Sequence, residues 1–270
     1  MNLVTNTAAV VIPLYKTSLD SFEIISLQQC FKVLDRHEII AVKPMSLNLD
    51  NYDFNFDQVI SFDDEYFADV AGYNKLMMST TFYQRFLDYS YILIYQPDVF
   101  VFKDELLYWS NSGYDYIGAP WLRYAPYPDF VKRLKSELIR YWHIKHDLKD
   151  PVTNFPTELQ RENKVGNGGF SLRNTRKFYE ICTTNTKMIA HYNSKPEHYY
   201  GEDIFWSMEV NRKGKRLRIP DYKTAINFSI ENNPQYAFQL LKDKYPFGCH
   251  AWDRNLDFWA PVLRSFDVNL

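Results

Sequence analysis

Apolar runs alternate with amphipathic segments along the first part of the chain. Residues 8–14 form a β-branched apolar run, which is typical of a strand buried on both faces. From Phe22 to Leu34 the apolar positions follow a period near 3.6, which predicts a helix capped by Ser18 or Asp20. Residues 37–42 then form the next strand. This β-α-β order predicts parallel strands joined by a right-handed crossover.

The same pattern continues to about residue 121. Residues 73–87 form a helix candidate that feeds directly into 91–95, the most strand-like stretch of the chain. That strand stops at Gln96-Pro97-Asp98. Shorter strands are expected at 58–62, 99–102 and 114–121.

The middle of the chain carries a strongly charged helix candidate, 129–147. Its apolar stripe lies among lysines and arginines and consists of Val131, Leu134, Leu138 and either Tyr141 or Trp142. Such a stripe predicts a solvated amphipathic helix, with a membrane-surface or acceptor-binding helix as the alternative. Residues 151–162 read as a loop. Beyond them we expect a strand over 166–173 followed by a helix, and a further helix over 199–211.

Composition places the chain among ordinary globular proteins. It has 46% hydrophobic and 24% charged residues, without internal repeats or low-complexity tracts, so we predict one α/β domain over 1–270. A net charge of −2 gives no reason to expect nucleic acid as a partner. The aromatic fraction, 17%, suits both a thick core and a site lined with rings.

Cysteine usage and the N-terminal sequence bear on the cellular setting. Cys30, Cys182 and Cys249 are odd in number and lack CxxC spacing, which argues against a disulfide framework and a structural zinc site. A reducing, cytoplasmic setting follows as an expectation. We expect no signal peptide and no transmembrane segment, because no apolar stretch approaches the length of a membrane helix. Peripheral contact with the inner face of a membrane stays open.

Ligands of open α/β sheets bind beyond the carboxyl ends of the strands, so residues that follow strands are site candidates. Asp98 stands between two apolar runs, where a carboxylate needs a cation or a hydrogen-bond donor. It is either a turn former after Pro97 or an acid that presents its oxygens to a metal ion or a ribose.

Three further segments carry candidate chemistry. Gly166, Gly168 and Gly169 form either a tight turn or a place where a ligand passes close to the backbone. Glu202 and Asp203 open a predicted helix, where the macrodipole alone favours acids, or else they supply a general base. The remaining candidate, His250, is either a hydrogen-bonded structural residue or a second metal ligand beside Asp98.

Taken in order, these blocks resemble a known family. VVIPLY, YILIYQPDVFVF, YDYIGAPW, VGNGGFSLR, GEDIFWS and PFGCHAW are similar to blocks of uncharacterised bacterial proteins with a GT-A-like glycosyltransferase domain, found among surface-polysaccharide genes. The resemblance covers about residues 8–252. It implies a GT-A-like, Rossmann-like, mostly parallel sheet flanked by helices, with a nucleotide-binding half at about 1–120 and an acceptor-side half at about 121–270.

The resemblance also implies roles for single residues. Gln96-Pro97-Asp98 occupies the place of the DxD motif, whose carboxylates hold Mn²⁺ or Mg²⁺ against the donor diphosphate. Gln96 replaces the first Asp, so metal dependence is left open, and the implied metal ligands are Asp98 and His250. The implied base is Asp203, with Glu202 beside it. Donor-binding positions are Pro13 and Tyr15 at the nucleoside, Asn167, Gly168 and Gly169 at the sugar, and Arg173, with Arg123 and Lys164 as further cations able to replace a metal ion.

The function that follows is transfer of a sugar from a nucleoside-diphosphate donor to a carbohydrate or lipid-linked acceptor in surface-polysaccharide synthesis. A GT-A-like module that binds a nucleotide or glycan without catalysis is the alternative, and Gln96 is its main support. A nucleotidyltransferase is disfavoured because residues 14–17, after the first strand, contain no glycine.

Overall fold

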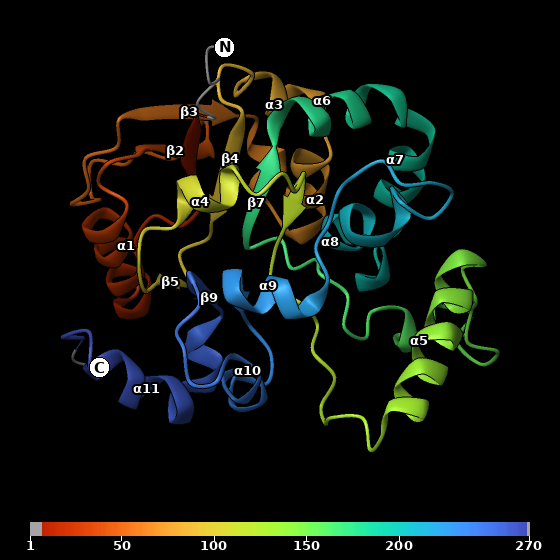
Figure 1. Cartoon of the computed structure of the whole chain (residues 1–270). Coiled ribbons are helices and arrows are strands. Elements are labelled where there is room, and N and C mark those ends of the chain that lie inside the picture. Colours follow the sequence, from red (N-terminus) through yellow and green to blue (C-terminus); the bar gives the residue numbers. More distant parts are fainter. Residues whose placement is uncertain (1–6, 269–270) are drawn as a thin grey trace, which may run out of the picture.

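A mixed sheet organises the molecule. A computed structural model describes residues 7–268 (Figure 1), and within them six strands form one sheet in the order β3-β2-β1-β4-β7-β6. The first four of these strands are mutually parallel, whereas β7 runs antiparallel to both β4 and β6. The predicted mixed, mostly parallel sheet flanked by helices is therefore confirmed. The strands are β1 (Ala8–Pro13), β2 (Glu38–Pro44), β3 (Gln58–Phe62), β4 (Tyr91–Tyr95), β6 (Tyr116–Ile117) and β7 (Phe170–Asn174).

Both faces of this sheet are buried, which explains the continuous apolar runs. Alternate side chains of β1 enter different cores: Ala9 and Val11 point into one, and Val10 and Ile12 into the other. The first core is closed by α2 (Val70–Met77), α3 (Thr80–Gln84) and α6 (Thr175–Thr184), and the second by α1 (Ser21–Val33) and α4 (Leu106–Ser110).

The strand order reverses next to β1. The chain moves outward from β1 through α1 to β2 and β3, and then returns through η1 (Asp64–Phe67), α2 and α3 to β4 on the other side of β1. In open α/β sheets a ligand crevice forms at such a reversal, outside the carboxyl ends of the strands. The fold therefore directs attention to the segments that follow β1 and β4.

A second, three-stranded sheet lies beyond those carboxyl ends. It has the order β5-β9-β8, from β5 (Val99–Val101), β9 (Gly248–His250) and β8 (Ser229–Ile230). Val99 pairs with His250, so the segment after β4 is joined to the C-terminal part of the chain (Figure 1). The surrounding helices are α9 (Tyr222–Phe228), α10 (Pro234–Leu241), η5 (Trp252–Asn255) and α11 (Leu256–Arg264).

Two predicted helices are interrupted in the structure. The helix expected over 73–87 is two helices, α2 and α3, because Ser79 accepts a hydrogen bond from Phe82 N and caps a new start. The helix expected over 199–211 consists of three short turns, with α8 at its centre. Of the two caps predicted for α1, Ser18 and Asp20, the structure has Asp20, which forms a capping box with Glu23. The short turns are η3 (His198–Tyr200), α8 (Glu202–Ile204) and the π-helical η4 (Phe205–Glu209), after α7 (Thr186–Asn193).

The charged middle helix is α5 (Phe130–Lys145), capped by Asp129. It packs mainly on η2 (Glu158–Gln160), a 3-10 turn within the segment expected to be a loop, and α5 has no buried residue. Its apolar stripe faces solvent, unlike the stripe of an ordinary surface helix. Among residues 7–268 we find no helix that combines the length and apolarity needed to cross a bilayer.

Candidate functional site

Three side chains meet just beyond the carboxyl end of β4. Gln96 and Asp98 follow this strand, and His250 is brought to them because β9 pairs with β5. The His250 Nε2 atom lies 3.1 Å from Asp98 Oδ1 and 3.2 Å from Gln96 Oε1. The structure therefore brings together the two predicted metal ligands and the residue that replaces the first Asp of the motif.

Glu231, which the sequence analysis missed, completes this group. It follows β8, whose pairing with β9 sets Ile230 opposite Cys249 and so places Glu231 level with His250. Glu231 Oε1 lies 3.6 Å from His250 Nδ1, and Glu231 Oε2 accepts a hydrogen bond from the amide of Asn167. We call Gln96, Asp98, His250 and Glu231 the histidine cluster.

Gly168 and Gly169 allow the backbone to pass between charged side chains. Gln96 N donates to Gly169 O at 2.9 Å, which ties the glycine loop to the end of β4. A Cβ on Gly169 would lie 2.1 Å from His250 Nε2, and a Cβ on Gly168 would lie 2.0 Å from Glu202 Oε1. A larger residue at either position would therefore displace one of the two side chains.

Charge holds the histidine cluster together. Burial acts to lower the pKa of His250, but the carboxylates of Asp98 and Glu231 raise it to about 10. Burial acts to raise the pKa of Asp98, yet the hydrogen bond and the charge of His250 lower it. In the absence of a metal ion, the side chain of His250 is therefore a protonated imidazolium between two carboxylates.

Arg173 and Glu202 form a second ion pair, which is closed to solvent. Arg173 is 0% exposed and its Nη2 lies 3.0 Å from Glu202 Oε1, while Nη1 donates to Tyr83 Oη at 2.9 Å. This burial contradicts the prediction that Arg173 contacts the donor, and Glu202, itself buried, is engaged as its counter-ion. Arg173 also supports the glycine loop, because its Nη2 donates a hydrogen bond to Gly168 O. Glu202 holds the Arg173 guanidinium in place for this contact.

Asp203 differs from its neighbour. Its side chain is only partly buried, and its Oδ1 accepts a hydrogen bond from Ile204 N at 2.7 Å. Burial and the nearby charges of Glu202 and Glu231 raise the pKa of Asp203 to about 7, although Ile204 N and Arg161 act in the opposite direction. A carboxylate with this pKa can take up a proton near neutral pH.

Three further positions were predicted to contact the donor: Asn167, Pro13 and Tyr15. Asn167 is buried and braces the glycine loop, since its Oδ1 accepts from Gly169 N at 3.0 Å. Pro13 is the last residue of β1. Val11 pairs with Ile94 of β4, and two residues further along this register Pro13 lies level with Gln96. Tyr15 is exposed two residues further on.

The two other cations named from the sequence, Arg123 and Lys164, have other surroundings. Arg123 pairs with Glu162 at 3.6 Å and its guanidinium lies over the ring of Tyr127. Burial and the charge of Arg140 in α5 lower the pKa of Lys164. Neither is joined to the histidine cluster by a hydrogen bond or ion pair within the described chain.

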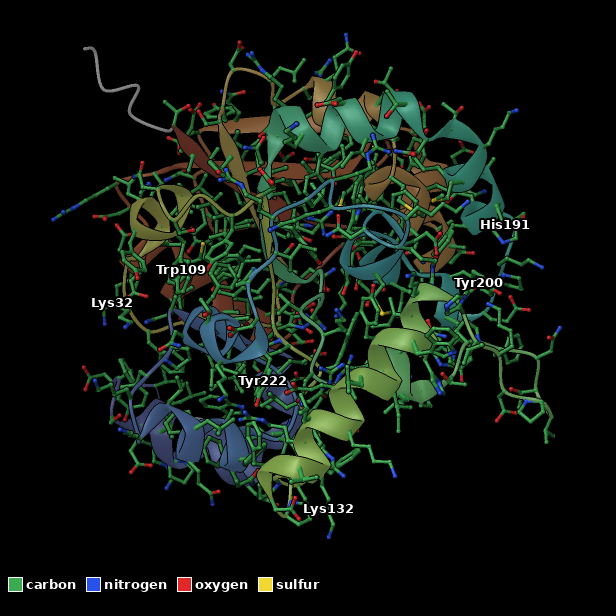
Figure 2. The ribbon with its side chains drawn as sticks, turned by 45° about the vertical axis from the view of Figure 1, so that its right-hand side comes forward. Lys32, Trp109, Lys132, His191, Tyr200 and Tyr222 are labelled. Carbon is green, nitrogen blue, oxygen red and sulfur yellow. The ribbon has the colours of Figure 1, made fainter. Side chains whose placement is uncertain are left out.

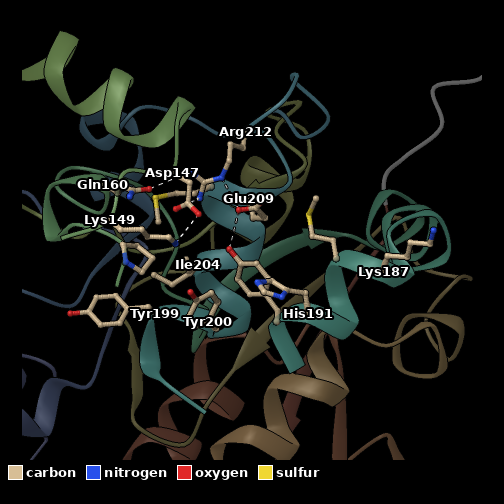
Figure 3. Close-up of a pocket in the computed structure, with 14 residues that line it drawn as sticks. Asp147, Lys149, Gln160, Lys187, His191, Tyr199, Tyr200, Ile204, Glu209 and Arg212 are labelled. Atoms are coloured by element: carbon tan, nitrogen blue, oxygen red, sulfur yellow. Dashed lines mark hydrogen bonds and ion pairs between the residues drawn. The ribbon is translucent and has the colours of Figure 1, made fainter. Parts of the chain in front are cut away.

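A separate cavity of about 360 Å³ is lined by residues of α7, η3, α8 and η4, among others (Figure 3). Tyr199, Tyr200 and His191 contribute rings to its wall, and Arg212 lines it while paired with Glu209 at 2.7 Å. None of the histidine cluster lines this cavity. It is connected to the candidate site through α8, because Ile204, next to Asp203, belongs to its wall.

Sequence reasoning also missed two side chains of α2. Asn74 Oδ1 accepts a hydrogen bond from Glu202 N at 3.2 Å, and burial and the charge of Glu202 raise the pKa of Tyr73. Both lie in a segment predicted to be helical, but the helical period alone does not tell which residues approach α8. A position just after a strand was the sequence feature that could have identified Glu231. It was missed because β8, the strand before it, has only two residues and is not visible as an apolar run.

The sheet and the histidine cluster define an α/β protein with a polar site at the carboxyl ends of parallel strands. The chain belongs to the family described as "protein of unknown function (DUF5672)", whose model matches residues 57–250. No curated protein matches it. Similar solved structures include that of the WbbM bifunctional glycosyltransferase in its apo form, with 12% identity and a TM-score of 0.49. The similarity covers 93% of this chain but 46% of that one, so the chain spans less than half the length of that protein.

Proposed function

We propose that this protein transfers a sugar from a nucleoside-diphosphate donor to a carbohydrate or lipid-linked acceptor. The observation that carries the proposal is the convergence of Gln96, Asp98 and His250 where the strand order reverses. That is the position at which doubly wound sheets bind nucleotides. The ordered blocks that resemble GT-A-like proteins supply the reaction class.

The histidine cluster fits the divalent cation that the resemblance implies. Ligand atoms around a six-coordinate Mg²⁺ lie about 3 Å apart at its usual bond length, and Asp98 Oδ1 and Gln96 Oε1 stand 3.1 and 3.2 Å from His250 Nε2. Glu231 faces the other ring nitrogen, the outer position that orients metal-binding histidines. Residues 7–268 contain no group of three or more His, Cys, Asp and Glu side chains able to hold a metal ion. Gln96 and the donor phosphates would therefore complete the shell.

Residues of the chain itself bind the donor sugar and remove the proton of the acceptor. The ion, when bound, neutralises charge on the departing diphosphate. Asn167 and the glycine pair shape the wall against which the donor sugar lies, and the Arg173–Glu202 pair keeps that wall in place. Asp203 takes the proton of the attacking hydroxyl, for which its raised pKa suits it.

The acceptor is expected on the side of α8 that faces the ring-lined cavity. Ile204 lines that cavity directly after Asp203, and Tyr199 and Tyr200 offer aromatic surface on which sugar rings pack. Arg161, whose guanidinium lies over Tyr199, is one of the charges that act on Asp203. A hydroxyl delivered from this side would approach the base without crossing the histidine cluster.

Replacing one carboxylate tests the donor site. In Asp98→Asn we expect nucleotide-sugar turnover to fall by at least about 100-fold, because an electrostatic group is lost where charge develops. The fold should persist, since the Asp98 side chain is 31% exposed. Calorimetry with a panel of nucleotides and nucleotide sugars, with Mn²⁺ or with EDTA, would measure binding, and product release would measure turnover.

The matched control is Asp104→Asn. Asp104 pairs with His37 at 2.9 Å and is not a member of the histidine cluster. Full turnover in Asp98→Asn would contradict the proposal. Nucleotide binding without any turnover in the unaltered protein would instead indicate a binding module without catalysis.

A further inference from the structure

The arrangement of α5 is the reverse of an ordinary surface helix. Its exposed apolar side chains are 40–72% exposed and comprise Phe130, Val131, Leu134, Leu138, Ile139, Tyr141 and Trp142. Its arginines turn toward the protein instead: the Nε of Arg133 and the Nη1 of Arg140 are buried atoms. The side that faces solvent is therefore the apolar one.

The inner side of α5 is fixed to the body by polar contacts. His143 Nδ1 lies 2.8 Å from Thr157 Oγ1, and Arg212 Nη1 donates to the carbonyl of Ile144. These contacts prevent α5 from rolling its apolar stripe inward. The outward orientation is thus set by packing at the C-terminal end of the helix.

The charge of α5 bears on the kind of surface that this helix can bind. The helix contains five lysines and arginines but a single acid, Glu137, which lies 3.8 Å from Arg133 on the inner side. Lys132, Lys135 and Lys145 remain exposed beside the apolar stripe, although the whole chain carries a net charge of −2. Lys132 has an exposed ion-pair partner in Asp129, at 3.7 Å, and Lys145 lies over the ring of Tyr141. The outer face still combines apolar and aromatic side chains with an excess of exposed positive charge, which is complementary to an anionic lipid surface.

We propose that α5 is a membrane-binding helix that lies in the interface of an anionic bilayer. Figure 1 shows α5 at the margin of the molecule, clear of the large sheet, and Figure 2 shows Lys132 at its outer end. Leu134, Leu138 and Trp142 enter the boundary between headgroups and acyl chains, while the lysines reach the lipid phosphates. A two-fold contact between two copies is disfavoured, because it would set the lysines of one α5 against those of the other.

Vesicle binding by the full chain tests this proposal. We expect sedimentation with phosphatidylcholine vesicles that contain about 30 mol% phosphatidylglycerol, and much weaker binding to phosphatidylcholine alone. Leu134→Glu/Leu138→Glu should lose binding by at least about tenfold, because charge replaces the inserted surface. Lys132→Ser/Lys135→Ser should weaken binding to the anionic vesicles by about 30-fold.

The matched control adds the same charge elsewhere. Val70→Glu/Leu107→Glu replaces two exposed apolar residues outside α5 and should bind vesicles like the unaltered protein. A blue shift of tryptophan fluorescence on vesicle addition should disappear in Trp142→Phe. Three results would overturn the proposal: no binding to the anionic vesicles, equal binding by the Leu134→Glu/Leu138→Glu variant, or a dimer of the unaltered protein that this variant converts to monomers.

Discussion

Two ion-paired groups stand on opposite sides of the glycine pair and are built differently. Behind Gly168, Arg173 and Glu202 are buried and joined at 3.0 Å. Beside Gly169, His250 is shared among Gln96, Asp98 and Glu231, and part of Asp98 remains exposed. The first group is closed to solvent, although Glu202 Oε2 has no hydrogen-bond partner, whereas the second leaves the Asp98 side chain 31% exposed.

The difference teaches which charges serve the fold and which are available to a ligand. A buried pair loses much of its stabilisation when one partner is removed, because an uncompensated charge is left inside. Asp98 is less costly to alter, since its side chain is partly exposed and His250 keeps a second carboxylate, that of Glu231. Variants of the two groups should therefore affect different properties.

The largest effect is expected for the closed pair. Arg173→Met leaves Glu202 buried without its counter-ion and should lower the free energy of unfolding by about 3–5 kcal/mol. Urea denaturation followed by circular dichroism would measure this. The double variant Arg173→Met/Glu202→Met removes both charges and should recover much of the loss. A change below about 1 kcal/mol in the single variant would show that the pair is not a stability element.

A smaller effect, confined to turnover, is expected for Asp203. Asp203→Asn should reduce kcat by at least about 100-fold, equivalent to about 2.7 kcal/mol in the barrier, with nucleotide affinity retained. In the unaltered protein kcat should rise with pH and reach half its maximum near pH 7, where Asp203 loses its proton. Weakened nucleotide binding with normal kcat would contradict the role of Asp203 as base.

The raised pKa of Asp203 also predicts how the stability of the protein depends on pH. Because its pKa is raised in the folded state, the folded protein holds a proton that the unfolded chain has released. Stability should therefore fall as pH rises from about 4 to about 7, and it should fall less in Asp203→Asn. Denaturation midpoints across this range would compare the two proteins.

The smallest effect is expected in the open group, at Glu231. Glu231→Gln keeps the shape but removes the charge that faces His250 Nδ1, so affinity for nucleotide in the presence of Mn²⁺ should fall about tenfold. Affinity measured in EDTA should change little, which separates positioning of the histidine from a general structural role. An equal loss under both conditions would count against the cation site.

The sequence was most informative where a residue pattern and its neighbours agree. The strand 91–95 and the acid that follows it could be predicted, because a buried strand and its end are local properties. The burial of Arg173 could not, since it depends on Glu202, a partner 29 residues away. The apolar stripe of α5 could also be predicted from the sequence. The helical period shows which side chains share one face of the helix, but it does not show whether that face contacts the protein or solvent.

The pairing of β5 with β9 has a consequence for how the protein is made. All strands of the large sheet have been synthesised once Asn174 is added to the chain, whereas His250 follows much later. Newly made chains thus pass through a stage in which the scaffold can form and the candidate site still lacks its histidine. Premature termination between these two points would yield a scaffold without a complete site.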